Sequence, residues 1–386
     1  MHWKRWKVSG TSSLFFLGKT IKLVFKKFQI IKLFGIPIQL HWSFALMFMA
    51  VFYIGIANGY GSTGIFWLLM IMLSLFFCVV LHELGHALTA RRFGIRTKDI
   101  TLSPIGGVAM LDRMPEKPFQ EIIVALAGPA VNMVIAGLLL LYFHFFPTGN
   151  ILNLINPENF YPSREVLLPF LLVMNVTLAV FNLLPAFPMD GGRVFRGLLS
   201  LKWSRLRATQ IASVAGKIFA SAFTIFGIYN GDYVLAFIGV FIFSMANQEY
   251  KYVKFESSLG KHFVSEIYRD LFKKFQFTDS LQAVFAELKK GLENSFLVYD
   301  NQNLVGVIYE KNVLLGLKEK EEALVGEYTV HGYEQISTED TIKSAYAKMQ
   351  SAGVNILAVF ENGNLVGVLD SSMINNFVRL QEKIKM

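Results

Sequence analysis

Long uncharged apolar stretches dominate the first two thirds of the chain. Each is close to the thickness of a bilayer, which a helix of about 20 residues crosses. They cover residues 41–57, 64–81, 122–146, 166–189 and 233–248, and a sixth stretch, 208–229, is interrupted only by Lys217. This pattern predicts a polytopic α-helical membrane protein with about six transmembrane helices.

The composition also indicates a membrane protein. Hydrophobic residue types make up 53% of the 386 residues and charged types only 17%, and the mean hydropathy is +0.44. Soluble domains average about 45–50% apolar and about 25% charged residues. The chain has one cysteine, which excludes an intramolecular disulfide framework and a metal site built from several cysteines.

Basic residues are concentrated beside the apolar stretches. Residues 1–82 contain no Asp or Glu, and the loops at one end of the predicted helices hold 21 basic residues against one, Arg164, at the other end. This asymmetry predicts that both termini are cytosolic, and it makes nucleic-acid binding the weaker explanation of the net charge of +9. Lysines alternate with apolar residues over 20–34, which suits either a segment on the surface of the lipid bilayer or a solvated basic strand.

The last third of the chain, from about residue 255, is more highly charged and contains an internal repeat. Asn303-Leu304-Val305-Gly306-Val307 recurs as Asn364-Leu365-Val366-Gly367-Val368, an offset of 61 residues. Each copy predicts a helix, two strands joined by a tight turn, and a second helix. We expect helices at 281–290 and 342–352, and strands at 296–300, 304–309, 356–360 and 365–369. The sequence therefore predicts a soluble α/β unit after the membrane domain.

His82-Glu83-Leu84-Gly85-His86, at the end of an apolar stretch, has the spacing H-E-x-x-H. On a helix, His82 and His86 share one face, so both imidazoles can reach a single metal ion. Neutral imidazole suits Zn²⁺, and Glu83 beside the ligands could act as a general base. The alternative interpretation is a polar helix end at the membrane surface. It is the weaker one, because it would bury three ionisable groups without a function.

Catalytic zinc usually has three protein ligands, and Asp190 is the candidate for the third. It ends an otherwise uncharged stretch, in which Pro185 and Pro188 break the helix and Gly191-Gly192 allow a sharp turn. Non-helical backbone at membrane depth is tolerated where it lines a cavity or is buried in protein. In the charge-based topology, Asp190 lies at the same depth as His86, as a three-ligand site requires.

Together the two motifs resemble the site-2 protease family of intramembrane zinc metalloproteases. The resemblance rests on H-E-x-x-H at 82–86 and N-x-x-P-x-x-P-x-D-G-G at 182–192, and it covers about residues 35–250. It implies that His82, His86 and Asp190 bind one Zn²⁺ per chain and that Glu83 is the catalytic base. It also suggests that the amide of Asn182 stabilises the oxyanion, with a helix-packing hydrogen bond as the alternative.

The family resemblance implies a transmembrane or membrane-associated protein substrate that is cleaved near the cytosolic face. A transmembrane helix protects its own backbone, so it must unwind before hydrolysis. Residues 99–112 contain strand-forming residues around a Gly pair and predict a β-hairpin or re-entrant element at the cytosolic face. We expect its edge, at Gly106, Gly107 and Val108, to bind the unwound substrate by strand pairing.

The carboxyl-terminal repeat resembles a tandem CBS domain over about residues 262–383. This resemblance implies a regulatory unit, often one that binds an adenine nucleotide between its halves. The family's ribose-binding positions read Tyr309 and Asn312, then Asp370 and Met373, so neither copy keeps the usual Thr/Ser and Asp. Docking of the substrate and formation of a homodimer are therefore alternatives to nucleotide binding. Site-2 proteases with CBS domains include those that process a sigma-factor precursor in sporulation, so such a precursor or an anti-sigma factor is the expected kind of substrate.

These features predict three parts: a basic membrane-surface segment at 1–40, an intramembrane metalloprotease domain at 41–254 and a cytosolic CBS pair at 255–386. Two other classes of protein share some of the features. A transporter regulated by CBS domains would explain the broken helix and the intramembrane acid, but it gives no reason for Glu83 between two histidines. A catalytically silent scaffold would not need the four candidate site residues.

Overall fold

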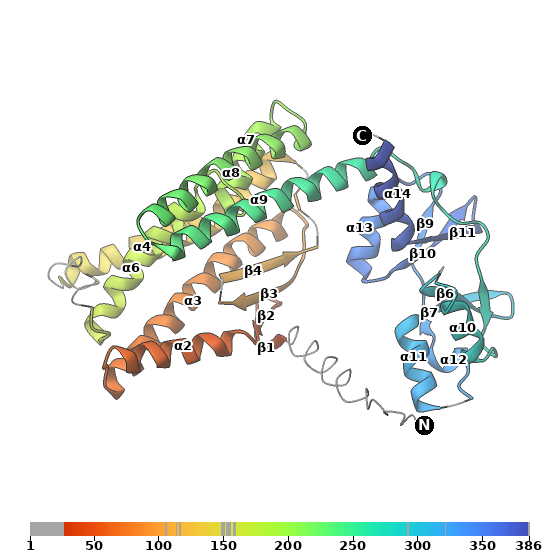
Figure 1. Cartoon of the computed structure of the whole chain (residues 1–386), viewed down its shortest axis with the longest axis horizontal. Coiled ribbons are helices and arrows are strands. Elements are labelled where there is room, and N and C mark those ends of the chain that lie inside the picture. The colour runs from red at the N-terminus through yellow and green to blue at the C-terminus, as the bar shows by residue number, and fades with distance from the viewer. Residues whose placement is uncertain are drawn as a thin grey trace, which may run out of the picture. The chain divides into compact units, whose positions relative to one another are not determined.

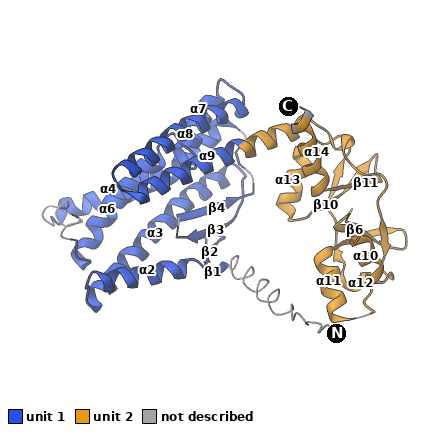
Figure 2. Ribbon diagram, viewed as in Figure 1, with its two compact units in different colours: residues 1–250 blue, residues 251–386 orange. Residues whose placement is uncertain are grey.

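The computed structural model describes residues 27–104, 106–112, 114–115, 117–147, 151, 156, 160–291, 293–320 and 322–384. Most of the predicted basic membrane-surface segment, residues 1–26, lies outside the described residues. The chain divides into two compact units, residues 1–250 and 251–386 (Figure 2). The boundary between the units falls within α9 (Tyr233–Leu259).

Helices make up most of the first unit (Figure 1). In the described part of the chain, four helices are long and apolar enough to cross a membrane: α3 (Ser62–Arg92), α4 (Pro118–Phe145), α6 (Arg164–Asn182) and α8 (Arg205–Tyr229). The other two predicted stretches are also helical but do not meet both requirements. The first forms α2 (Phe44–Ala57), which has only 14 residues, and the last forms the apolar part of the 27-residue α9. The helical membrane fold is confirmed, with a smaller number of full-length spans than the six predicted.

One predicted stretch, 166–189, is not a single helix. α6 ends at Asn182, and residues 183–189 form turns before α7 (Asp190–Ser200) begins. Pro185 and Pro188 lack the backbone N–H that a continuing helix requires, and the peptide bond before Pro188 is cis. The break places Asp190 in the first turn of a separate short helix.

Small residues let the helices of the first unit approach closely, as at many helix interfaces in membranes. A Cβ atom on Gly85 of α3 would lie 2.8 Å from the carbonyl oxygen of Ala127 in α4. A Cβ atom on Gly197 of α7 would lie 2.5 Å from the side chain of Ile122, also in α4. α4 therefore packs directly on both α3 and α7, the two helices that carry the candidate metal ligands.

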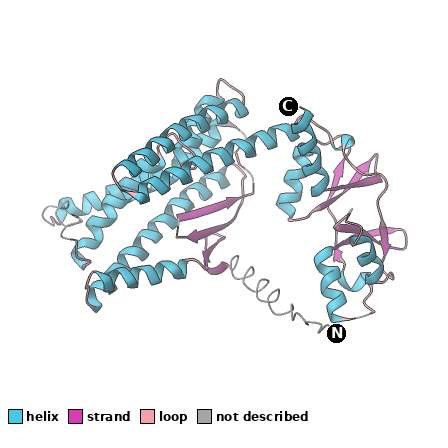
Figure 3. Ribbon diagram, viewed as in Figure 1, coloured by secondary structure: helices cyan, strands magenta, loops and turns pink. Residues whose placement is uncertain are grey.

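A four-stranded sheet belongs to the same unit (Figure 3). Its order is β1 (Lys27–Leu33), β2 (Ile36–His41), β3 (Thr97–Ser103) and β4 (Gly106–Leu111), with β2 and β3 parallel and the other pairs antiparallel. β3 and β4 form the hairpin that was predicted within 99–112. Gly106 begins β4 with φ +132°, a conformation that residues with a side chain rarely adopt. β4 is an edge strand, and it packs against α3.

The second unit contains two copies of one motif, as the internal repeat predicted. The first copy comprises β5 (Lys274–Gln276), α10 (Leu281–Leu288), β6 (Ser295–Asp300), β7 (Asn303–Tyr309) and α11 (Glu310–Glu319). The second comprises β9 (Gln335–Ser337), α13 (Ile342–Ala352), β10 (Ile356–Glu361), β11 (Asn364–Asp370) and α14 (Ser371–Ile384). The described part of this unit also contains the end of α9 and three short elements: η2 (Val264–Glu266), α12 (Val325–Tyr328) and β8 (Val330–His331).

The two copies share their hairpin register and an apolar core. Asp300 pairs with Asn303 in the first hairpin, and Glu361 pairs with Asn364 in the second. Asn301 and Asn362 occupy the turns with φ +55° and +51°, which asparagine tolerates better than most residues. Apolar residues of both hairpins form one buried cluster: Leu297, Val307, Ile356, Ala358 and Val368. The predicted α/β fold with two copies of one motif is confirmed.

Candidate metal centre

The two histidines of the H-E-x-x-H motif lie on one face of α3, within the helix and not at its end. Both residues are buried, with 7% of His82 and 6% of His86 exposed. Their Nε2 atoms are 3.1 Å apart because residues four apart on a helix lie one above the other. Two imidazole nitrogens that face one point in a buried site favour a shared cation.

Asp190 joins the histidines from α7. Its Oδ2 atom lies 3.1 Å from Nε2 of His86 and 3.3 Å from Nε2 of His82. The preceding turns pack so tightly on the start of α7 that a Cβ atom on Gly192 would lie 2.7 Å from the carbonyl carbon of Ala186. The absence of a side chain at Gly192 therefore allows the turn that brings Asp190 to α3.

The geometry of the three groups fits a zinc ion. Each residue offers one ligand atom, and these atoms lie within 4.8 Å of one another. A tetrahedral zinc ion with bonds of about 2.0–2.1 Å separates its ligand atoms by about 3.3–3.4 Å, close to the 3.1–3.3 Å found here. Two imidazoles and one carboxylate are also a known ligand set of catalytic zinc, and they leave a fourth position open.

α4 closes one side of this site. A Cβ atom on Gly128 would lie 2.6 Å from Nε2 of His82 and closer still to Nε2 of His86, so glycine leaves the space that a metal ion needs. The Nδ1 atom of His86 is 2.7 Å from the carbonyl oxygen of Val124, one turn earlier in α4. This contact fixes the tautomer that directs Nε2 of His86 toward the candidate metal position.

Glu83 is directed toward the sheet. Its carboxylate accepts a hydrogen bond from the backbone N–H of Ala109 in β4, at 3.0 Å. A Cβ atom on Gly107 would lie 2.8 Å from Cγ of Glu83, so β4 lies directly against this side chain. Since the N–H of Ala109 is bonded to Glu83 and not to β3, it points away from β3, on the side of β4 that has no partner strand. The candidate base therefore lies at the free edge of β4.

The remaining predicted site residues are Asn182 and the residues of the hairpin. Asn182 is the half-buried last residue of α6, and no hydrogen bond among the described residues joins it to the candidate ligands. Its role at the oxyanion stays a prediction. The carbonyl oxygen of Gly106 accepts a hydrogen bond from Oγ of Ser103, at 3.1 Å, and stabilises the turn of the hairpin. Val108, two residues further, is 60% exposed.

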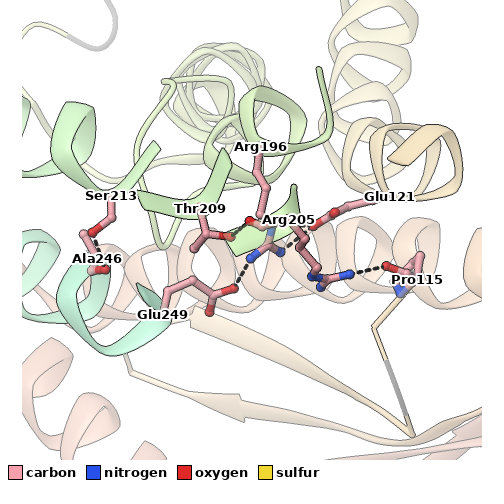
Figure 4. Close-up of polar contacts among 8 residues, drawn as sticks. All are labelled: Pro115, Glu121, Arg196, Arg205, Thr209, Ser213, Ala246 and Glu249. Atoms are coloured by element: carbon pink, nitrogen blue, oxygen red, sulfur yellow. Dashed lines mark hydrogen bonds and ion pairs between the residues drawn. The ribbon is translucent and has the colours of Figure 1, made fainter. Parts of the chain in front are cut away.

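A buried ion-pair cluster beside the site was not predicted from the sequence. Arg196 of α7 pairs with Glu121 of α4 and with Glu249 of α9 (Figure 4). Arg196 is fully buried, and its guanidinium carbon lies 5.0 Å from the centre of the Phe187 ring. The cluster holds α7, and with it Asp190, against α4 and α9. An acid at the start of an apolar helix was visible in the sequence, but its partner lies 75 residues away.

Comparison with known proteins identifies relatives of this chain. A family model described as Peptidase family M50 matches residues 70–165 and 158–224. The zinc metalloprotease MJ0392 of Methanocaldococcus jannaschii is 33% identical over 361 residues, which cover 92% of this chain and 98% of the relative. Stage IV sporulation protein FB of Bacillus subtilis is 25% identical over 257 residues, which cover 63% of this chain and 82% of the relative.

Some solved structures are similar to parts of this chain. The site-2 protease from Methanocaldococcus jannaschii is 37% identical, covers 58% of this chain and 95% of its own, and has a TM-score of 0.44. Several solved structures with CBS domains match 28–34% of this chain, with identities of 10–19% and TM-scores of 0.27–0.30. The match with MJ0392 extends over nearly the whole of both proteins, which confirms the family predicted from the two motifs. This chain belongs to the site-2 protease family of zinc metalloproteases, peptidase family M50.

Proposed function

We propose that this protein hydrolyses a peptide bond in a transmembrane or membrane-associated protein, close to the cytosolic face of the membrane. One observation carries the proposal. The buried group of His82, His86 and Asp190 lies among membrane-length helices, and Glu83 beside it reaches the free edge of β4. A metal site, a base and a strand edge within reach of one another are what the hydrolysis of an extended peptide requires.

Each site residue has a definite role in this proposal. His82, His86 and Asp190 would hold one zinc ion per chain. Bound zinc would activate a water molecule for attack and polarise the scissile carbonyl. Glu83 would take a proton from the attacking water and deliver it to the leaving amine. We assign the oxyanion contact to Asn182, in the broken segment before Asp190.

The edge of β4 is the proposed binding site for the unwound substrate. The amide of Ala109 points outward, so the alternation of an antiparallel ladder turns the amide of Val108 inward, toward its partner Thr101. A substrate strand beside β4 would therefore bond to the outward groups of Gly107 and to the outward carbonyl oxygen of Ala109, whose N–H is already bonded to Glu83. This would place the substrate backbone next to the carboxylate of Glu83.

The orientation in the membrane and the division into parts are proposals that rest on charge and composition. Basic residues flank the predicted helices at one end, which supports cytosolic termini. We accordingly propose a basic bilayer-surface segment at 1–40, a protease domain at 41–254 and a cytosolic CBS pair at 255–386. In this orientation, α3 ends at the cytosolic face with Arg91 and Arg92.

We propose that the CBS pair regulates cleavage or binds the substrate. A cleft between the two copies, bordered by Lys273, Glu293 and Asp370, has about 0 Å³ of space that a water molecule could occupy. Ligand pockets usually measure about 300–1,000 Å³, so an adenine nucleotide would have to widen this cleft. This favours docking of a protein, either the substrate or a second copy of the chain. The similarity to a sporulation protein supports a membrane-associated substrate such as a sigma-factor precursor or an anti-sigma factor.

Zinc content and cleavage of a single-span reporter protein test the proposal. The full-length wild type is compared with Glu83→Gln and with a control, Glu165→Gln, which alters an exposed carboxylate in the first turn of α6. We expect about one zinc ion per chain in all three proteins and loss of cleavage only in Glu83→Gln. Cleavage by Glu83→Gln at the rate of the wild type would remove Glu83 from the mechanism. A wild type that binds no zinc would contradict the metal site, and metal-independent ion flux would support a transporter instead.

A further inference from the structure

Four unpaired polar atoms belong to α3, α4 and α6, the helices that carry or pack beside the two histidines. They are Nδ1 of His82, Oδ1 and Nδ2 of Asn132, and Oδ1 of Asn175, each buried and without a hydrogen-bond partner among the described residues. Asn132 is 1% exposed and Asn175 is fully buried. Folded proteins contain few such atoms, because burying an unpaired polar group is costly. A group of three residues with this property indicates a function that the fold alone does not require.

Asn132 lies on the face of α4 that covers the site. It follows Gly128 by one helical turn, and Gly128 is in contact range of the Nε2 atoms of both histidines. His86 of α3 contacts Val124 of α4, whereas Gly85, earlier in α3, lies against Val131, later in α4: a Cβ atom on Gly85 would lie 2.9 Å from Val131. The two helices therefore run in opposite directions. Side chains of a helix lean toward its N-terminus, so His82 and Asn132 lean toward one another across the interface.

Asn175 of α6 reaches the same layer. Its Nδ2 atom donates hydrogen bonds to the carbonyl oxygen of Leu171, at 2.8 Å, and to Sγ of Cys78, at 3.4 Å. Cys78 lies one turn before His82 on α3, so the amide of Asn175 is held beside the histidine. Because Nδ2 of Asn175 is occupied, its Oδ1 atom is left as an acceptor that needs a donor.

The unpaired atoms are complementary in chemistry. A histidine that directs Nε2 to a metal carries its proton on Nδ1 and needs an acceptor there. His86 has the backbone carbonyl of Val124 for this purpose, whereas His82 has none among the described residues. We propose that Asn132 is the positioning residue for His82. Its Oδ1 accepts the Nδ1–H of His82, and its Nδ2 donates to Oδ1 of Asn175, when His82 binds the metal. The inference rests on the proposed role of His82 as a zinc ligand.

The zinc affinity of the full chain, measured by competition with a chromophoric chelator, tests this role without an activity assay. Asn132→Leu keeps the volume and removes the acceptor, and we expect it to weaken zinc binding by about 10–100-fold. Asn132→Asp keeps the acceptor and should bind zinc about as well as the wild type. In the zinc-free protein, Asn132→Leu should be at least as stable as the wild type, because an unpaired amide is replaced by an apolar group.

Three comparisons make the test decisive. Thr209→Val is the matched control, since it removes a buried hydroxyl on α8 that bonds to the carbonyl oxygen of Arg205. It should leave the zinc affinity unchanged. In a His82→Ala background, Asn132→Leu should cause no further loss. If Asn132→Leu fails to fold, the visible absorption of Co²⁺ bound to Asn132→Asp and to Asn132→Gln reports the ligand geometry, and we expect only Gln to perturb it.

Several outcomes would overturn the inference. Equal zinc affinity of Asn132→Leu and the wild type would do so, as would a loss of zinc-free stability without a change in affinity. Unchanged Co²⁺ absorption in both polar variants would count equally against it. A wild type that binds zinc tightly but cleaves no reporter would refute the proposed function and leave this inference standing. A wild type that binds no zinc would refute both.

Discussion

The ion-pair cluster around Arg196 makes a quantitative prediction about stability. Arg196→Met leaves the carboxylate of Glu121, which is only 4% exposed, without its counter-charge. Removing one partner of a buried pair costs about 3–5 kcal/mol. Glu249 has a side chain that is 27% exposed and stays solvated, so its pair adds at most about 1 kcal/mol. We therefore expect Arg196→Met to lower the free energy of unfolding by about 4 kcal/mol, a large part of the about 5–15 kcal/mol that proteins have.

Denaturant unfolding of the detergent-solubilised full chain measures this loss. The double variant Arg196→Met/Glu121→Met removes both charges and should recover to within about 1 kcal/mol of the wild type, because two apolar side chains can replace a buried pair without a large cost. Arg207→Met, which removes an exposed charge from α8, is the control and should change stability by less than about 0.5 kcal/mol. A double variant as unstable as Arg196→Met, or a stable Arg196→Met, would refute the reasoning.

Four further substitutions separate the parts of the molecule. Gly128→Ala introduces a Cβ atom against both imidazoles, so the purified protein should keep its helical circular dichroism and lose its zinc; a normal zinc content would show that α4 can move away. Ala109→Pro removes the outward N–H that bonds to Glu83, and it should abolish reporter cleavage with the zinc content and stability unchanged. Val108→Pro removes an inward N–H of the ladder with β3, so it should also lower the melting temperature. At the start of α14, the carboxylate of Asp370 accepts hydrogen bonds from the backbone N–H groups of Ser372, at 2.8 Å, and Met373, at 3.0 Å. Asp370→Ala removes this carboxylate, so it should destabilise the second unit by about 1 kcal/mol without changing the zinc affinity.

The sequence predicted those features that local spacing determines. Two histidines four residues apart must share a face of any helix that contains them, and the structure brings both together with Asp190. The internal repeat predicted the helix and the hairpin of each copy in the second unit, because turn chemistry and apolar periodicity are local properties. Its elements begin and end within a few residues of the predicted ranges.

Features that depend on contacts between distant residues were not predictable. Asn132 belongs to the family resemblance, but the sequence assigned it no role, and its unpaired amide is visible only in the structure. Arg196 was one basic residue among several, and its partners come from two other helices. Four of the predicted stretches form helices of membrane-spanning length in the described part of the chain. Apolar content alone did not reveal that α2 stops after 14 residues, whereas Pro185 and Pro188 had predicted the break in the fourth stretch.

Gly128 provides a criterion for separating active members of this family from inactive ones by sequence. The H-E-x-x-H motif can persist in a protein that has lost its chemistry, because two histidines and a glutamate are compatible with a folded helix. A side chain at the position of Gly128 would occupy the space between the imidazoles and the metal. We therefore expect pseudoproteases of this lineage to be recognisable by a larger residue at this position, even where all three ligands and Glu83 are retained.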